Sequence, residues 1–237
     1  MTGLPRRIAV LLSGRGSNLD ALIERVHRAA DVPAEIVGVV ANRPGAGGLE
    51  RARAAGITAA CVDHRAFSGR EAFETVLATT LEALEPDLLL LAGFMRILTP
   101  GFVERFSPRM LNIHPSLLPD FPGLDTHARA LERGDAEAGA SVHVVIPELD
   151  SGPVLARVRV PVEPGDDPQR LEARVRSAEH LLYPVVTAWV ASGRIELDAR
   201  TPRLDGRPLP PQGIDHRVEE GRLKRCSEES EEHEDSD

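Results

Sequence analysis

The sequence predicts an α/β fold with a mostly parallel, twisted sheet and helices on both of its faces. In the first half, short continuous apolar runs alternate with longer stretches of helical spacing, which is typical of strands buried on both sides. In the second half, only a short loop separates two extended stretches, and this predicts antiparallel strands there. The N-terminal half is therefore expected to be Rossmann-like, and the C-terminal half to add antiparallel strands.

The strands are predicted from apolar runs that glycine, proline or polar turns interrupt. They cover residues 8–12, 36–41, 58–62, 88–92, 110–114, 141–146 and 153–160. Helices are predicted between them, at residues 19–29, 49–55, 70–84, 101–106, 126–133 and 168–189. Gly56 is expected to end the second helix, and Thr99 with Pro100 to begin the fourth, as an N-cap and a first-turn proline.

Length and composition limit the class of protein. The chain has 237 residues, 42% of them hydrophobic, which suits one or two compact domains. No apolar run approaches the roughly 18 to 20 residues that span a bilayer, so no membrane association is expected. The two cysteines, Cys61 and Cys226, are far apart, which argues against a disulfide framework and a structural zinc site. A cytoplasmic protein is expected.

The net charge of −9 is concentrated at the C-terminus. The last ten residues, EESEEHEDSD, hold seven acids, and subtracting these seven charges from −9 leaves −2 for the rest. A nearly neutral body does not favour nucleic acid as a partner. We expect a folded domain over residues 1–212 and an acidic, disordered tail over residues 213–237. Because Lys224 is the only lysine, a P-loop lysine and a Schiff-base lysine in the body are excluded.

The first candidate site is the loop SGRGSN at residues 13–18, between the first strand and the first helix. Its glycines allow a sharp turn that presents backbone amides to an anion at the helix N-terminus. Leu19 occupies the third glycine position of a dinucleotide fingerprint, so a monophosphate fits better than a dinucleotide. A tight turn without any ligand is the alternative.

The second candidate is the pair Asn112 and His114. Two residues apart on one strand, their side chains point to the same face, and Pro115 favours an extended conformation for His114. An amide beside an imidazole suits oxyanion binding and proton transfer. The alternative is a strand end at which both side chains bind loop backbone.

The third candidate is Asp150, in the stretch PELDSGP. An Asp before Ser-Gly-Pro is an ordinary turn former; the functional alternative is a carboxylate that holds a histidine in its charged form. The histidines show no metal-binding spacing, so no metal is expected. On local pattern alone, His143 is a packed strand histidine, Glu179 lies on a solvated helix face and Arg70 is a surface charge.

Four segments occur in one order in a known family: SGRGSNL at 13–19, AGFMRIL at 92–98, LNIHPSLLPDFPG at 111–123 and ELDSGPV at 148–154. The chain resembles the folate-dependent formyltransferases and, through SGRGSNL, the phosphoribosylglycinamide formyltransferases among them. The resemblance extends from about residue 7 to residue 212. It implies a formyltransferase-type fold and transfer of a formyl group from 10-formyltetrahydrofolate, as co-substrate, to the amine of glycinamide ribonucleotide in purine synthesis.

The resemblance also implies a role for individual residues. The substrate phosphate would bind at Gly16, Ser17 and Asn18, and the ribose hydroxyls at Glu179. The catalytic set would be Asn112, His114 and Asp150. The reduced folate would bind at Arg70, Met95, Arg96, Ile97, Leu98, Asn112, Ile146, Pro147, Glu148, Leu149 and Asp150. Two residues depart from the family pattern: Asp120 stands where a basic residue is frequent, and Asp125 where a histidine is often seen.

Three other functions stay open on the sequence. In a formyltetrahydrofolate hydrolase, water replaces the amine, and an additional N-terminal regulatory domain would be expected. A methionyl-tRNA formyltransferase would be expected to have a further C-terminal domain and a basic face. A non-catalytic nucleotide-binding module would bind phosphate without turning over folate. The expected partners are small molecules only, and the chain is expected to be a monomer or a homodimer.

Overall fold

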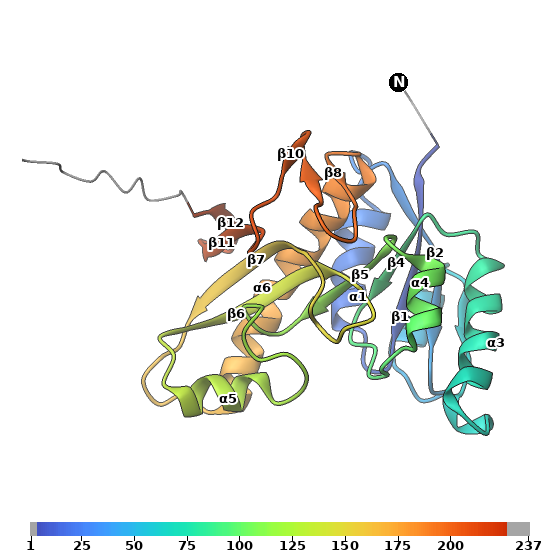
Figure 1. The fold of residues 1–237 in the computed structure, drawn as a ribbon, viewed down its shortest axis with the longest axis horizontal. Coiled ribbons are helices and arrows are strands. Elements are labelled where there is room, and N and C mark those ends of the chain that lie inside the picture. The colour runs from blue at the N-terminus through green and yellow to red at the C-terminus, as the bar shows by residue number, and fades with distance from the viewer. Residues whose placement is uncertain (1–3, 227–237) are drawn as a thin grey trace, which may run out of the picture.

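The computed structural model describes residues 4–226 and contains one large sheet of nine strands (Figure 1). Across the sheet the order is β12-β11-β7-β6-β5-β4-β1-β2-β3. The strands are β1 (Arg6–Leu12), β2 (Ala34–Ala41), β3 (Ala59–Cys61), β4 (Leu88–Leu91), β5 (Met110–His114), β6 (Glu137–Val144), β7 (Val154–Pro161), β11 (Ile214–Glu219) and β12 (Arg222–Arg225). A small second sheet contains β8 (Ile195–Glu196), β9 (Arg203–Leu204) and β10 (Arg207–Pro208).

The strand directions confirm the predicted fold class. The strands β3, β2, β1, β4 and β5 run parallel to one another, whereas β6 is antiparallel to both β5 and β7. The Rossmann-like half therefore ends at β5. Because β6 and β7 are joined by a loop of nine residues (145–153) rather than a crossover helix, they pair as antiparallel neighbours.

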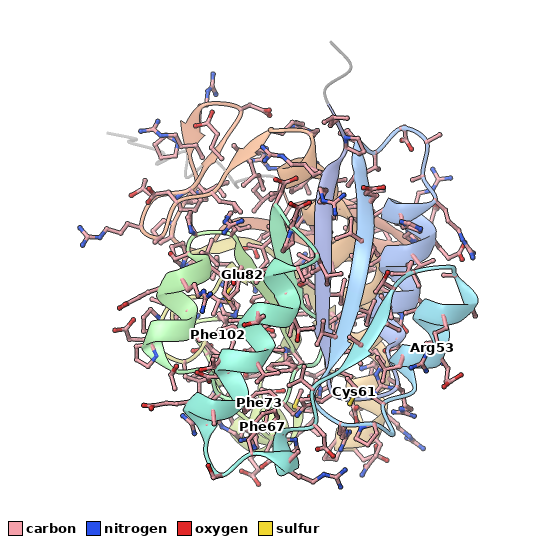
Figure 2. The ribbon with its side chains drawn as sticks, turned by 90° about the vertical axis from the view of Figure 1, so that its right-hand side faces the viewer. Arg53, Cys61, Phe67, Phe73, Glu82 and Phe102 are labelled. Atoms are coloured by element: carbon pink, nitrogen blue, oxygen red, sulfur yellow. The ribbon has the colours of Figure 1, made fainter. Side chains whose placement is uncertain are left out.

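Helices cover both faces of the sheet and enclose two apolar cores. The helices are α1 (Ser17–Leu22), which continues into the π-helical turn η1 (Ile23–His27), α2 (Gly48–Ala54), the 3-10 turn η2 (His64–Ala66), α3 (Arg70–Glu82), α4 (Pro100–Phe106), α5 (Thr126–Arg133) and α6 (Pro168–Ala191). Successive β1 residues alternate between the cores: Val10 packs with α1, α2 and α6, and Leu11 packs with α3 and α4. Figure 2 shows Phe73 and Phe102 on the α3 and α4 side.

Local sequence signals determine where several helices begin and end. The Thr99 hydroxyl accepts a hydrogen bond from the Phe102 amide at 3.4 Å, and Pro100 occupies the first turn of α4, as predicted. Gly56 follows α2 with a positive φ of 76°, a conformation that glycine adopts without strain. The long α6 lies across the middle of the sheet and packs on β6 and β7 (Figure 1).

The predicted end of the folded domain at residue 212 is wrong. Strand β11 pairs in parallel with β7, and β12 pairs antiparallel with β11, so the sheet continues to residue 225. Ile214 and His216 are buried in β11, and Glu220 and Gly221 form the hairpin turn with positive φ angles of 50° and 71°. Because this segment is highly charged, its alternating strand pattern was not recognised from the sequence and a disordered tail was predicted instead. The acidic segment from residue 227 onward lies outside the described residues.

No helix within residues 4–226 is long and apolar enough to cross a bilayer.

Candidate active site

The predicted site residues gather where the parallel strands end. The loop after β1 carries Gly16, the loop after β4 carries Met95, and β5 ends at His114. In α/β sheets, ligands bind in the crevice outside the carboxyl ends of the strands. The Ser13 hydroxyl accepts a hydrogen bond from the Met95 amide at 2.8 Å and ties the first two of these loops together.

The structure brings Asn112, His114 and Asp150 together. Asn112 and His114 lie on the same side of β5, and Asp150 comes from the loop between β6 and β7. The His114 Nδ1 atom lies 3.4 Å from the Asp150 Oδ2 atom, and less than a tenth of either side chain is exposed. The imidazole and the carboxylate therefore face each other away from solvent. The Asp150 backbone has a positive φ of 49°, which is unusual for a residue with a side chain.

Two loop backbone groups complete this pair. The His114 Nε2–H group donates a hydrogen bond to the Phe121 carbonyl at 2.9 Å. The Gly123 amide donates to Asp150 Oδ2 at 2.9 Å. The loop after β5, residues 115–125, is therefore attached to both side chains.

His143 belongs to the same cluster, although the sequence pattern indicated only a packed strand histidine. It is buried on β6 opposite Asn112, and its Nδ1–H group donates to the Val144 carbonyl at 3.0 Å. Burial lowers the pKa of His143, so the ring is neutral and its Nε2 atom accepts from the Asn112 side-chain amide at 3.1 Å. This contact sets the orientation of Asn112. The sequence alone does not single out His143. Its position opposite Asn112 becomes evident only once the pairing of β5 with β6 is known.

A cavity of about 90 Å³ with mostly apolar lining residues opens beside Asn112 and Asp150. It is lined by Leu91, Phe94, Arg96, Ile97, Leu98, Val103, Asn112, His143, Val145, Ile146, Pro147, Leu149 and Asp150. Most of the residues predicted for the folate site are among these. Met95 and Glu148 are not, and the structure does not bring Arg70, which is exposed at the start of α3, to this cavity. Apolar walls with an amide and a carboxylate at one end fit a flat ring system with polar edges.

A second cavity of about 150 Å³ lies on the other side of the β5 end. It is lined by Asn18, Gly93, Met95, Ile113, Pro115, His127, Glu172, Arg176 and Glu179. Asn18 donates a hydrogen bond to Glu179 at 2.8 Å, and burial raises the pKa of Glu179 to about 7. Glu179 is thus a buried group of the cavity rather than part of a solvated helix face.

The loop before α1 requires glycine at position 16. Its φ is 83°, and a Cβ atom there would lie 2.7 Å from the Gly48 Cα atom. The loop therefore approaches the start of α2 closely, with Ser17 as the first residue of α1. Within the described residues, the Asn18 Oδ1 atom is buried without a hydrogen-bond partner, so an acceptor is available next to the cavity.

The two residues that depart from the family pattern lie around α5. Asp120 forms an ion pair with Arg133 at 2.8 Å, and about half of each side chain is exposed. Asp125 precedes α5 with a positive φ of 57°. Neither carboxylate replaces a member of the buried cluster. In residues 4–226, no group of three or more His, Cys, Asp or Glu side chains is arranged to hold a metal ion.

The fold and this cluster define a formyltransferase, and the chain belongs to the formyl transferase family, whose model matches residues 6–187. Over 206 residues it is 48% identical to phosphoribosylglycinamide formyltransferase of Escherichia coli strain K12, covering 87% of this chain and 97% of that protein. It is 43% identical to the enzyme of the same name from Haemophilus influenzae, covering 88% and 98% of the two chains. The solved phosphoribosylglycinamide formyltransferase of Coxiella burnetii superposes with a TM-score of 0.84 at 44% identity, covering 89% of this chain and 99% of the other.

Proposed function

We propose that the chain transfers a formyl group from 10-formyltetrahydrofolate to the amine of glycinamide ribonucleotide, a step of purine biosynthesis. The products are the formylated ribonucleotide and tetrahydrofolate. One observation carries this function: Asn112, His114 and Asp150 converge between two cavities of different chemistry. The relatives named above support the same substrates.

The two substrates occupy the two cavities. The phosphate of the ribonucleotide binds the amides of Gly16, Ser17 and Asn18 at the start of α1, where unpaired N–H groups and the helix dipole favour an anion. The ribose hydroxyls contact Glu179. The folate lies in the apolar cavity against residues 95–98 and 146–150, so that its formyl group reaches Asn112.

Transfer begins when the substrate amine attacks the formyl carbon and negative charge develops on the formyl oxygen. The Asn112 amide has two hydrogens, and one of them is held by His143. The other is directed to the developing oxyanion. A preorganised donor of this kind lowers a barrier by about 2.7 to 4 kcal/mol.

His114 is the second donor, and its present partner must change first. Its Nε2–H group donates to the Phe121 carbonyl at 2.9 Å, while Nδ1 faces Asp150. Binding of the formyl group displaces the Phe121 carbonyl and leaves His114 held by Asp150 alone. The attacking amine loses a proton, through His114 or through water. The bond between the formyl carbon and nitrogen 10 of the folate then breaks, and nitrogen 10 gains a proton as tetrahydrofolate leaves.

A turnover assay tests this function. Glycinamide ribonucleotide is mixed with 10-formyltetrahydrofolate, and release of tetrahydrofolate is followed with and without the ribonucleotide. We expect release only when both are present. Release without the ribonucleotide would instead indicate a formyltetrahydrofolate hydrolase. Binding of the ribonucleotide without any release would indicate a nucleotide-binding module.

The compartment, oligomeric state and binding partners of the enzyme are part of the same proposal. We infer a cytoplasmic monomer or homodimer that acts on small molecules, without nucleic acid or membrane as partner. The near-neutral body of the chain supports this. Light scattering across a concentration series measures the oligomeric state, and filter binding with duplex DNA or tRNA tests the absence of nucleic acid binding.

A further inference from the structure

A buried arginine connects the C-terminal hairpin to the loop beside the catalytic cluster. Arg157, on β7, has only 5% of its side chain exposed. Its Nε and Nη2 atoms donate to the two carboxylate oxygens of Asp215, on β11, at 2.9 and 2.7 Å. A bidentate contact of this kind is the strongest type of arginine–carboxylate ion pair.

The remaining arm of the guanidinium points the other way, into the loop after β5. The Arg157 Nη1 atom donates to the Leu118 carbonyl at 3.1 Å. The Leu118 amide donates to the Ser141 hydroxyl at 3.0 Å, and that hydroxyl donates to the Ser116 carbonyl at 2.7 Å. Both backbone groups of Leu118 are therefore fixed to the sheet.

This anchor lies three residues before the loop touches the cluster. After Leu118 the chain reaches Phe121, whose carbonyl accepts from His114, and then Gly123, whose amide donates to Asp150. The formyl group displaces the first of these contacts, whereas the second remains in place to orient Asp150, so a displaced Leu118 would shift Asp150 through Gly123. The position of the loop therefore depends on the direction in which Arg157 points.

The direction of Arg157 depends in turn on Asp215. A buried guanidinium without a partner is strongly unfavourable, and Asp215 supplies that partner. Burial alone would raise the pKa of Asp215, but Arg157 and Arg159 lower it below its ordinary value, so the carboxylate is charged at neutral pH. Asp215 belongs to the hairpin β11–β12, which lies beyond the stretch that the family model matches, residues 6–187.

We propose that Asp215 is a positioning residue for formyl transfer: through Arg157 it holds Leu118, and with it the loop 115–125, so that the Gly123 amide keeps Asp150 directed at His114. This inference rests on the proposed function. It assigns to the C-terminal hairpin a role in the rate of the reaction in addition to its role in the sheet.

The first test is Asp215→Asn, which keeps the shape and removes the charge. A control is Glu219→Gln in the same hairpin, whose exposed partner is Lys224. We expect kcat to fall roughly tenfold to a hundredfold in Asp215→Asn, as for a small misplacement of reacting groups, and to be unchanged in the control. A normal kcat in Asp215→Asn overturns the proposal.

A second test separates positioning from stability. In the double variant Arg157→Met with Asp215→Leu, apolar residues replace both charges, a change that commonly preserves stability. We expect a Tm near that of the wild type with a kcat as low as in Asp215→Asn, because the Leu118 carbonyl has lost its donor. Recovery of kcat together with Tm would show that the pair only stabilises the fold, and would overturn the proposal.

A third measurement does not depend on the reaction. Hydrogen exchange of the peptide containing residues 115–125 is compared between Asp215→Asn and Glu219→Gln. Faster exchange in Asp215→Asn alone is expected, and equal exchange overturns the proposal. If the wild type shows no turnover, the proposed function fails, while this measurement still decides whether Asp215 holds the loop.

Discussion

The side chains of Asn18 and Glu179 are joined by a hydrogen bond of 2.8 Å across 161 positions of sequence. Asn18 is in the first turn of α1, and Glu179 is in the middle of α6. The contact ties the predicted phosphate loop to the helix that crosses the sheet. Because Glu179 is almost fully buried, loss of solvent raises its pKa to about 7, although the hydrogen bond from Asn18 acts in the opposite direction.

This pKa predicts a pH-dependent stability. As pH rises from about 4.5 to about 7, the unfolded chain releases the Glu179 proton while the folded chain retains it, so the free energy of unfolding decreases. One such carboxyl accounts for a loss of about 3 kcal/mol. Glu179→Gln cannot ionise, and we expect it to gain stability relative to the wild type as pH rises through this window.

Urea unfolding of both proteins at about pH 5 and about pH 8 measures this difference. Glu132→Gln is the control, since Glu132 is an exposed glutamate on α5. Parallel pH profiles for the wild type and Glu179→Gln would show that Glu179 keeps an ordinary pKa.

Asp150→Asn should abolish most of the turnover. The substitution removes the negative charge that faces the His114 ring, although the amide can still accept from the Gly123 amide. We expect kcat to fall by about 10² to 10⁴ in Asp150→Asn and in His114→Ala, with both KM values little changed. Steady-state kinetics measure this, with Glu132→Gln on α5 as an exposed control. Near-normal kcat in either variant would remove that residue from the mechanism.

Asn112 and His143 should act as one unit. Asn112→Ala is expected to lower kcat by about 10² to 10³, the loss typical of one oxyanion donor. Because His143 sets the orientation of the Asn112 amide, His143→Gln should also lower kcat, and the double variant should be no slower than Asn112→Ala alone. If the fold-losses in kcat of the two single variants multiplied in the double variant, His143 would not act through Asn112.

Tyr183→Phe should destabilise the fold. The buried Tyr183 hydroxyl on α6 lies 3.1 Å from the carbonyl oxygens of both Leu91 and Leu111, on the adjacent strands β4 and β5. Removing the hydroxyl leaves these carbonyls without that donor, and we expect a loss of about 1 kcal/mol in the free energy of unfolding. Urea unfolding measures it. An unchanged midpoint and slope would show that the hydroxyl contributes nothing to stability.

The body of the sheet could be predicted because its strands are buried on both faces. In a chain of this composition, a continuous apolar run such as 88–92 fits few structures other than a buried strand. The turns around it contain glycine and proline. The hairpin at residues 214–225 was missed for the opposite reason. Its charged residues resemble a solvated tail, and only pairing with β7 shows that one of its faces is buried.

The local sequence pattern predicts only part of the site. That Asn112 and His114 share a face follows from strand alternation, because residues two apart point to the same side. Their catalytic role was implied only by the family resemblance. His143 and Glu179 could not be assigned in this way, since a strand histidine and a helix glutamate are ordinary in sequence. Their partners, Asn112 and Asn18, are 31 and 161 positions away.

The sequence by itself determined the strands β1 to β7, the glycine-dependent loop after β1 and the polar pair at the end of β5, because each rests on short-range periodicity or backbone conformation. Only the tertiary structure decided that Asp150 reaches His114, that Asn18 meets Glu179, and that Arg157 joins Asp215 to Leu118. Contacts between distant segments depend on strand order and helix packing, which local spacing does not encode.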